Sequence, residues 1–368
     1  MTEPEPLQQI DRTYVRFRGR RLSYFSGCDY FRLASHPRVA AALETGVRRY
    51  GLNVAASRMT SGNHSLYLDL EAELARFFGA ESALLVPSGY LADLVAAQAL
   101  TGEFSHALID ESAHAALVDA SSMLACPVLR FKHCDTDDLA RVARRCGPGS
   151  KIIVLTDGLF SRDGQVAPLR DYAGALPEDA LLLVDDAHGA AVLGKTGKGT
   201  LEHTGVGRAR VLQTVTLSKG FGVYGGAVLG PKKFRRRIID RSHVFIGSTP
   251  LPLPLANAAL ESVRVLRSDK TLRRRLAENL AYVRGCLHPA GEAPHDFSGP
   301  ALTLSPQNQQ TVRAVKRALL SCRIYPPHIR YPGGPALGYF RFVISSEHTR
   351  AQLDLLVQAL TEFRSHLR

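Results

Sequence analysis

Short apolar segments recur along much of this chain, separated by stretches long enough to form helices. The most constraining is Leu181–Asp186, which starts with four consecutive apolar residues, as expected of a strand buried on both faces. Because parallel strands need helix-length crossovers, this alternation predicts an α/β fold with a mostly parallel central sheet and helices on both faces. The other expected strands are Ala83–Pro87, Ala107–Asp110, Lys151–Asp157, Val211–Leu217 and Gly226–Leu229, with helices at Leu91–Ala99 and Ala115–Leu124.

The pattern changes near Ser248–Pro252. A long arginine-rich helical stretch is expected over Leu255–Leu287, and an amphipathic helix over Thr349–Phe363. Short strands are expected at Ala301–Ser305 and Phe340–Ser345. We therefore expect an N-terminal segment (1–35), a large α/β domain (36–250), and a linking helix with a smaller C-terminal α+β domain (251–368).

The charge balance of the 368-residue chain points to anionic partners. The formal net charge is +12, and of 46 basic residues only nine are lysines. Arginine suits phosphates and carboxylates, whereas lysine is the residue that forms Schiff bases, so covalent lysine chemistry has few candidates. The clusters Arg235–Arg237 and Arg273–Arg275 lack interleaved aromatic residues, and we expect solvated helix faces there, with no nucleic-acid partner.

Cysteine spacing and the N-terminal residues predict a cytoplasmic protein. The six cysteines include no Cys-x-x-Cys pair, so neither a metal site nor a disulfide framework is expected. The N-terminus is acidic and proline-rich where a secretory signal would be basic and then apolar. The longest apolar runs are too short to span a bilayer, so no membrane partner is expected.

One motif suggests nucleotide binding. The segment Gly189–Thr196 matches the P-loop pattern G-x-x-x-x-G-K-[ST], and the strand Leu181–Asp186 precedes it as a P-loop requires. The following residues, Gly197–Gly205, are too rich in glycine to begin a helix, which leaves half of the required context missing. A P-loop nucleotide-binding protein is an alternative interpretation of this segment.

A second set of residues lies at the ends of the expected strands, where open α/β sheets bind ligands. Asp185 and His188 follow one strand, and Lys219 follows another. Ser88, Gly89 and Tyr90 lie where a strand turns into a helix, whose N-terminus suits a phosphate. His114 follows a further strand. A phosphate site, a lysine, a carboxylate and an imidazole are together what pyridoxal 5′-phosphate (PLP) requires.

The sequence from about Ser26 to His348 resembles the α-oxoamine synthase family of fold-type I PLP enzymes. The motifs that carry the resemblance keep the family's order and spacing. They are Ser57-Arg58, Leu70-Glu71, Pro87–Tyr90, Asp110 with His114-Ala115, Phe131–Asp135, Phe160–Gly164, Val184–Gly189, Thr216–Lys219, and Arg341 ahead of Ser346–His348.

The resemblance implies a role for each residue that matches these motifs. Lys219 would hold PLP as a Schiff base, and Asp185 would pair with the pyridine nitrogen. His114 would stack on the ring, and His188 would bond its phenolic oxygen. Other expected cofactor contacts are Ser88, Gly89, Tyr90, Ser161 and Thr216. The expected substrate contacts are Arg341, which would clamp the amino-acid carboxylate, Ser161, and Cys28 in place of the family's asparagine.

The resemblance further implies a reaction and its partners. A small, alanine-like amino acid would condense with an acyl thioester, carried by coenzyme A or a carrier protein, and lose carbon dioxide to give an α-aminoketone. Family members are homodimers with the active site at the subunit interface. In the family, Gly189–Thr196 is a glycine-rich loop that follows the Asp/His strand.

This chain departs from the family's pattern mainly at positions expected to face the substrate. Besides Cys28, it has Asn53–Ala56 where the family has a glycine-rich run, Tyr67 in place of a histidine, Cys134 in place of an asparagine, and Asp157 in place of a glutamate. These departures favour altered substrate specificity. Another PLP reaction on the same scaffold, that of an aminotransferase or an aldolase, is the alternative.

Overall fold

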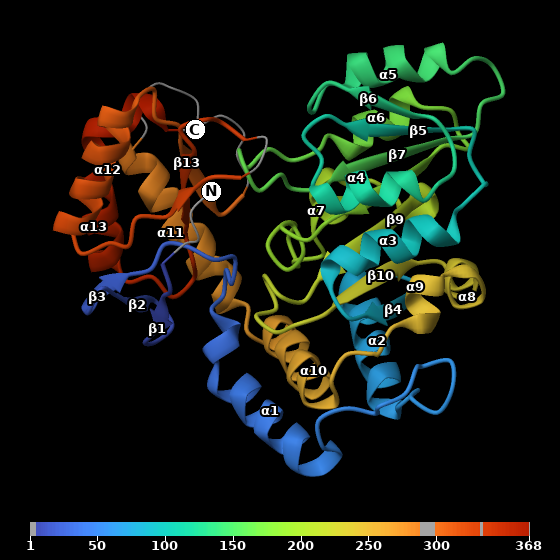
Figure 1. The fold of residues 1–368 in the computed structure, drawn as a ribbon, viewed down its shortest axis with the longest axis horizontal. Helices are drawn as coiled ribbons and strands as arrows, with labels where there is room; N and C mark the ends of the chain where they lie inside the picture. Colours follow the sequence, from blue (N-terminus) through green and yellow to red (C-terminus); the bar gives the residue numbers. More distant parts are fainter. Residues whose placement is uncertain (1–4, 288–298, 332–333, 368) are drawn as a thin grey trace.

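The computed structural model describes residues 5–287, 299–331 and 334–367, and its centre is a seven-stranded sheet (Figure 1). The strand order is β4-β10-β9-β8-β7-β5-β6, and β10 alone runs antiparallel to its neighbours. The strands are β4 (Ser82–Val86), β5 (His106–Asp110), β6 (Val128–Phe131), β7 (Ile152–Asp157), β8 (Leu181–Asp185), β9 (Val211–Thr216) and β10 (Gly226–Gly230). The six predicted strands and the mostly parallel sheet are confirmed, with ends shifted by at most one residue, and β6 is a strand that was not predicted.

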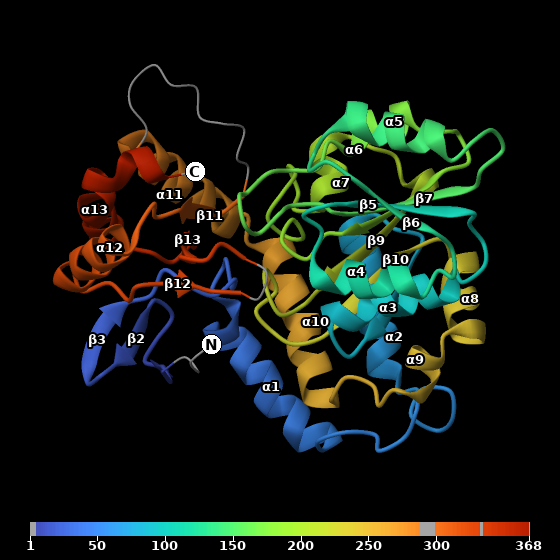
Figure 2. The same ribbon diagram turned by 45° about the horizontal axis from the view of Figure 1, so that its top comes forward.

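Alternate residues of each strand pack into different cores, which explains the continuous apolar runs. Ile153, Leu155 and Leu183 pack in one core with the apolar sides of α3 and α4, whereas Val154 and Leu182 face another core with α5 and α6. Helices therefore cover both faces of the sheet (Figures 1 and 2). They are α2 (Ser65–Phe78), α3 (Gly89–Ala99), α4 (Ala115–Ser122), α5 (Thr136–Arg145), α6 (Leu169–Ala175), α7 (Thr200–Thr204), α8 (Lys232–Arg241) and α9 (His243–Gly247).

The helical stretch expected over Leu255–Leu287 is two helices, not one. They are α10 (Leu253–Ser268), which packs against α1 (Pro37–Tyr50) and α2, and α11 (Thr271–Leu287). The break occurs because the side chain of Asp269 accepts hydrogen bonds from the Thr271 backbone N–H (2.9 Å) and hydroxyl (2.6 Å), which caps the new helix. Within the described ranges, no helix is both long and apolar enough to cross a membrane.

The C-terminal part contains a second sheet with strand order β11-β13-β12 and three helices beside it. Its strands are β11 (Ala301–Leu304), β12 (His328–Ile329) and β13 (Tyr339–Val343); its helices are α11, α12 (Gln309–Ser321) and α13 (Arg350–Leu360). The helix expected over Thr349–Phe363 is shorter than predicted, because Thr349 forms its capping box and a 3-10 turn (Thr361–His366) follows.

The N-terminal residues lie beside this C-terminal part (Figures 1 and 2). They form a three-stranded sheet of β1 (Gln8–Gln9), β2 (Tyr14–Phe17) and β3 (Arg20–Ser23), followed by a 3-10 turn (Leu33–Ser35). Ser23 pairs with Ile324, and the backbone N–H of Val343 donates to the carbonyl of Phe25 at 2.9 Å. These contacts bring residues near position 28 next to strand β13. The division at residues 35 and 250 stays a prediction.

Candidate active site

The predicted site residues gather at one edge of the central sheet. β4, β5, β7, β8 and β9 run in the same direction, so their carboxyl ends meet at this edge. The residues that follow these strands are Ser88, Gly89 and Tyr90 after β4, His114 after β5, Ser161 after β7, His188 after β8, and Lys219 after β9, with Asp185 and Thr216 at the strand ends. Ligands bind at such edges in α/β proteins.

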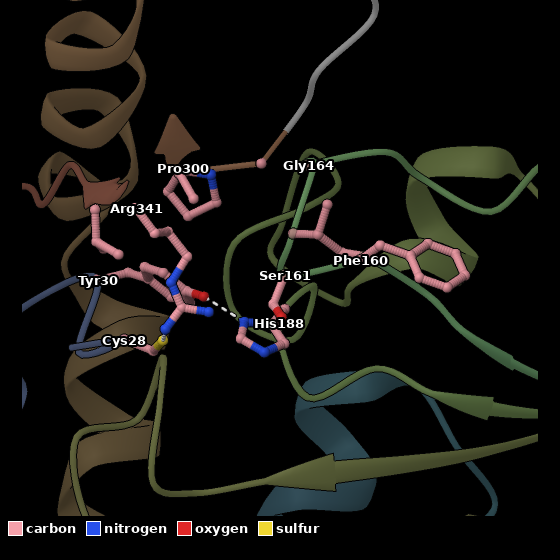
Figure 3. Close-up of a pocket in the computed structure, with 12 residues that line it drawn as sticks. Cys28, Tyr30, Phe160, Ser161, Gly164, His188, Pro300 and Arg341 are labelled. Atoms are coloured by element: carbon pink, nitrogen blue, oxygen red, sulfur yellow. Dashed lines mark hydrogen bonds between the residues drawn. The ribbon is translucent and has the colours of Figure 1, made fainter. Parts of the chain in front are cut away.

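Lys219, His188 and Tyr30 form a hydrogen-bonded chain. Lys219 Nζ lies 2.7 Å from His188 Nε2. On the other side of the ring, Tyr30 Oη lies 2.6 Å from His188 Nδ1 (Figure 3). Burial, followed by the positive charges of Lys219 and Arg341, holds the pKa of His188 well below its usual range. The imidazole is therefore neutral, and one of its nitrogens donates while the other accepts.

Two carboxyl groups lie side by side at the ends of β7 and β8. Asp157 and Asp185 are paired in the register of these parallel strands, and both are buried. Asp185 Oδ1 accepts from the N–H of Ala187 (2.9 Å), and Asp157 Oδ2 accepts from the N–H of His114 (2.8 Å). Burial and the neighbouring Asp185 raise the pKa of Asp157 well above its ordinary value.

The first turn of α3 fits a phosphate. A Cβ added at Gly89 would lie 2.6 Å from the Cβ of Thr216, so only glycine lets the helix start this close to β9. The Ser88 hydroxyl accepts from the N–H of Leu91 (3.3 Å) as the helix cap. The N–H groups of Gly89 and Tyr90 have no intrahelical acceptor, so they are suited to bind an anion.

Tyr90 and His114 lie at the open side of the site. Their rings meet edge to face with centroids 6.3 Å apart, and the Tyr90 hydroxyl donates to Asp119. His114 Nδ1 accepts from the N–H of Ala116 (3.2 Å) as the cap of α4. Loss of hydration lowers the pKa of His114, although the Asp185 carboxylate opposes this shift. Both rings are exposed, which leaves them free to contact a planar group.

A small pocket next to His188 collects the predicted substrate residues. Figure 3 shows Arg341, Cys28 and Tyr30 on one side of it and Ser161 on the other. The Arg341 guanidinium approaches the Cys28 sulfur at 3.8 Å. The apolar lining of the pocket comes from Leu159, Phe160, Pro300, Ala301 and Val343. The pocket thus combines one cation, suited to a carboxylate, with apolar walls.

Two residues near the site, Tyr30 and Asp93, were not predicted from the sequence. Tyr30, which contacts His188, lies two residues after Cys28, but its contact spans 158 positions of the chain. Asp93 lies beneath Asp185 on α3 and is the one charged residue in the segment Gly89–Ala99. A lone carboxylate in an otherwise apolar helix is a signal that could have revealed it.

The P-loop match does not form a phosphate-binding loop. The N–H groups of Val192 and Leu193 donate to the carbonyl of Gly189, and that of Ala191 donates to the carbonyl of Gly197. Glu202 accepts from the N–H and hydroxyl of Thr196. The expectation that no helix begins after this segment was wrong, because α7 begins at Thr200. The Asp186 carboxylate accepts from the N–H (2.9 Å) and hydroxyl (2.7 Å) of Thr200 and so holds this first turn.

Asp110, His133 and Cys134 lie close enough to suggest a metal site. However, the two ring nitrogens of His133 face carboxylates, Nδ1 at 3.0 Å from Asp110 and Nε2 at 3.1 Å from Asp163. Burial alone would lower its pKa, but these two hydrogen bonds raise the pKa of His133 to about 12. Because each ring nitrogen faces a carboxylate acceptor, both are engaged as donors, and the cluster forms an internal ion-pair network.

The fold and the residues at this sheet edge define a PLP-dependent enzyme of fold type I. The family described as aminotransferase class I and II matches residues 28–360. The 8-amino-7-oxononanoate synthase of Thioalkalivibrio sulfidiphilus is 36% identical over 345 residues, covering 93% of this chain and 88% of that protein. The enzyme of the same name from Xylella fastidiosa is 36% identical over 361 residues, covering 96% and 89%.

Solved structures agree with this class. A serine palmitoyltransferase variant from S. paucimobilis with a bound PLP–myriocin aldimine has a TM-score of 0.89 at 25% identity, covering 99% of this chain and 93% of that one. The Francisella tularensis 8-amino-7-oxononanoate synthase shares the fold, with a TM-score of 0.78 at 24% identity and coverages of 94% and 97%. The chain belongs to the class I and II aminotransferase family. It is a PLP-dependent enzyme of the α-oxoamine synthase type.

Proposed function

We propose that this enzyme condenses a small amino acid such as alanine with an acyl thioester, releasing carbon dioxide and leaving an α-aminoketone, as an 8-amino-7-oxononanoate synthase would. The observation that carries the proposal is the lysine–imidazole pair, Lys219 Nζ to His188 Nε2 at 2.7 Å, placed beside a pocket that contains Arg341. The names of the relatives support the choice of substrates.

The residues at the sheet edge would hold PLP in one orientation. Lys219 would bind its aldehyde carbon, and Asp185 would face its ring nitrogen. His114 would lie against the face of the ring, and His188 would bond to the phenolic oxygen. The phosphate would lie at the start of α3, near Ser88, Gly89, Tyr90 and Thr216, with Ser161 beside the cofactor. When bound, PLP withdraws electrons from the α-carbon of the amino acid.

The chain's own groups supply binding and proton transfer. Arg341 would hold the substrate carboxylate by a charge-assisted hydrogen bond, with Ser161 and Cys28 beside it. Lys219 Nζ would take the α-proton, and the neutral His188 can then accept from the new ammonium at Nε2 while its Nδ1 donates to Tyr30. The apolar walls, which include Phe160 and Pro300, would keep water from the reacting atoms.

The thioester partner should be anionic. Coenzyme A carries phosphates, and a carrier protein is acidic, so both would complement a chain with a net charge of +12. The amino acid and the thioester are small or tethered substrates, and no nucleic acid or membrane is needed for the reaction.

We propose that the enzyme acts as a homodimer whose active site lies at the subunit interface. Tyr90 and His114 at the site are exposed in a single chain, and further exposed apolar side chains lie on α1 and the loop after it, namely Leu43, Val47, Leu52 and Met59. A second copy of the chain would bury them. Light scattering should give twice the chain mass of 40.1 kDa; a particle of 40.1 kDa would refute the dimer.

One assay tests the proposed reaction. The purified enzyme with PLP is incubated with L-alanine and either acyl-coenzyme A or acyl-carrier protein, and free thiol and carbon dioxide are measured. Equal release of both, dependent on alanine, supports the condensation. Formation of a keto acid without thiol release would instead identify an aminotransferase and overturn the proposal.

A further inference from the structure

Asp93 is a fully buried carboxyl group beneath the candidate active site. It lies on α3, and its neighbours on this helix, Ala92, Val95, Ala96 and Ala97, are buried and apolar. Burying an unpaired carboxylate among such residues is costly, because the charge loses its hydration. Its protonation state therefore depends on the few polar groups it can reach.

The hydrogen bonds of Asp93 satisfy only one of its two oxygens. Oδ1 accepts from the hydroxyl of Thr214 at 2.5 Å. Oδ2 has no donor among the residues that the structure describes, although it is buried. A buried carboxyl oxygen without a donor can avoid the free-energy cost of an unsatisfied acceptor if it carries a proton and donates a hydrogen bond itself.

The acceptor for such a proton is Asp185. Strand register places Asp157, Asp185 and Thr214 side by side on β7, β8 and β9. Leu155 and Leu183, two residues earlier on the same side of their strands, pack in the core that α3 covers, so this row faces α3. Asp93, bonded to Thr214, lies within hydrogen-bonding reach of Asp185.

Among the residues that the structure describes, the groups that face Asp93 from the sheet include two further acids and no cation paired with it. They are Asp185 and Asp157, and the hydroxyl of Thr214 is the one donor. Burial, followed by the charge of Asp185, raises the pKa of Asp93 well above its ordinary value. Neighbouring carboxyl groups in an apolar site cannot all be ionised, so at least one keeps a proton.

Asp93 is better suited than Asp185 to keep that proton. Asp185 lies at the sheet edge, and its Oδ1 already accepts a backbone hydrogen bond from Ala187 at 2.9 Å. Asp93 lies deeper, and α3 carries no other charged residue.

We propose that Asp93 is a positioning residue that stays protonated at neutral pH and donates from Oδ2 to Asp185. The donation keeps Asp185 ionised and fixes the plane of its carboxylate toward the ring nitrogen of PLP. No proton leaves the pair during turnover. This inference rests on the proposed role of Asp185, and it assigns to Asp93 a function that acts through Asp185 alone.

Infrared spectroscopy of the PLP-loaded enzyme at pH 7 tests the protonation directly. The difference spectrum of wild type minus Asp93→Asn should contain the carbonyl band of a protonated carboxylic acid. If the pair of bands of an ionised carboxylate is lost instead, the inference is wrong. Asp157 and Asp185 are present in both proteins, so their bands cancel unless they respond to the change.

Cofactor binding to the stripped enzyme tests the positioning role. Asp93→Asn keeps a donor toward Asp185 and should bind PLP within about threefold of wild type, whereas Asp93→Leu should bind about tenfold more weakly or worse, because a hydrogen bond to a charged group is lost. Val95→Ala, a buried change on the same helix, is the matched control for altered packing. Equal binding by Asp93→Leu and Val95→Ala, or equal losses in Asp93→Leu and Asp93→Asn, would overturn the inference.

These measurements separate this inference from the proposed function. The alanine and thioester assay reports whether the condensation occurs, whatever the state of Asp93. The infrared band reports the proton on Asp93, whatever the reaction is. A protonated Asp93 in an enzyme that makes no α-aminoketone would therefore refute only the proposed function.

Discussion

His188 has a hydrogen-bonding partner at each ring nitrogen, and its buried position keeps the ring neutral. A neutral imidazole donates at one ring nitrogen and accepts at the other, so it can bond to Lys219 and Tyr30 at the same time without carrying a charge. This property makes Lys219 the residue whose loss should matter most, because its amine is both the proposed cofactor ligand and the proposed base.

Lys219→Ala should lower turnover by at least about a hundredfold, since the proton-transferring group is gone. The same variant should lose the visible absorbance of lysine-bound PLP. Lys195→Ala is the matched control, because Lys195 is an exposed lysine in the P-loop-like segment. Retained colour and turnover in Lys219→Ala would show that another residue holds the cofactor.

Arg341→Ala should mainly raise the KM for the amino acid. A charge-assisted hydrogen bond to a carboxylate contributes about 1.5–3 kcal/mol, which corresponds to a tenfold or larger increase in KM. Steady-state kinetics with varied alanine at saturating thioester measure it, and Arg313→Ala, an exposed arginine on α12, serves as the control. A wild-type KM in the Arg341 variant would rule out its role in binding the carboxylate.

At the scale of elements, a buried ion-pair network ties four segments together. Glu71 on α2 pairs with Arg58 in the preceding loop and with Arg235 on α8 (3.0 Å), and it accepts from the N–H of Leu85 on β4 (2.9 Å). The side chains of Glu71 and Arg58 are each only 6% exposed. The family motifs Ser57-Arg58 and Leu70-Glu71 therefore meet in one structural contact.

Glu71→Ala should destabilise the fold by about 3–5 kcal/mol, because it leaves the buried Arg58 guanidinium without its carboxylate partner and with only the Asn63 side-chain oxygen as acceptor. Urea unfolding of the two proteins measures the difference. Glu278→Ala removes an exposed ion pair with Arg274 on α11 and should change stability by less than about 1 kcal/mol. Similar losses in the two variants would contradict this account of the network.

At the scale of the whole molecule, buried histidines make stability depend on pH. His348 joins the N-terminal and C-terminal parts: its Nδ1 accepts from the N–H of Ser345 (3.0 Å), so its Nε2 donates to the carbonyl of Tyr24 (3.1 Å). Burial, followed by the charge of Arg32, lowers the pKa of His348 to about 3. The folded state thus keeps this ring neutral where the unfolded chain would protonate it.

Stability from His348 is complete above the unfolded pKa of about 6.5 and is lost as the pH falls from there toward 3. When the pH falls from 6.5 to 5, His348 should lower the free energy of unfolding of the wild type by about 1.5 kcal/mol. The variant His348→Gln should not show this loss. Urea unfolding at the two pH values measures the effect, with the exposed His203→Gln as control.

Comparison of variants isolates His348 from other titrating groups. Asp93 and Asp157, whose pKa values are raised, contribute in the opposite direction, and their contribution is common to wild type and His348→Gln. The inference about His348 fails if the two proteins lose the same free energy on acidification.

The sequence by itself determined the central sheet and the residues at its edge. Strand Leu181–Asp185 and the positions of Asp185, His188 and Lys219 follow from local patterns, because apolar runs predict buried strands and strand ends predict ligand contacts. The break between α10 and α11 and the start of α7 were missed, because single side chains, Asp269 and Asp186, decide them through hydrogen bonds.

Only the tertiary structure decided which distant residues meet. Tyr30 reaches His188 because residues 23–28 run beside strands of the C-terminal part, and the same contact brings Cys28 to Arg341. Asp93 reaches Asp185 because α3 packs over the row of side chains on β7, β8 and β9. Periodicity records which face of an element is buried, whereas the partner on that face depends on how the elements pack, and no local pattern encodes this.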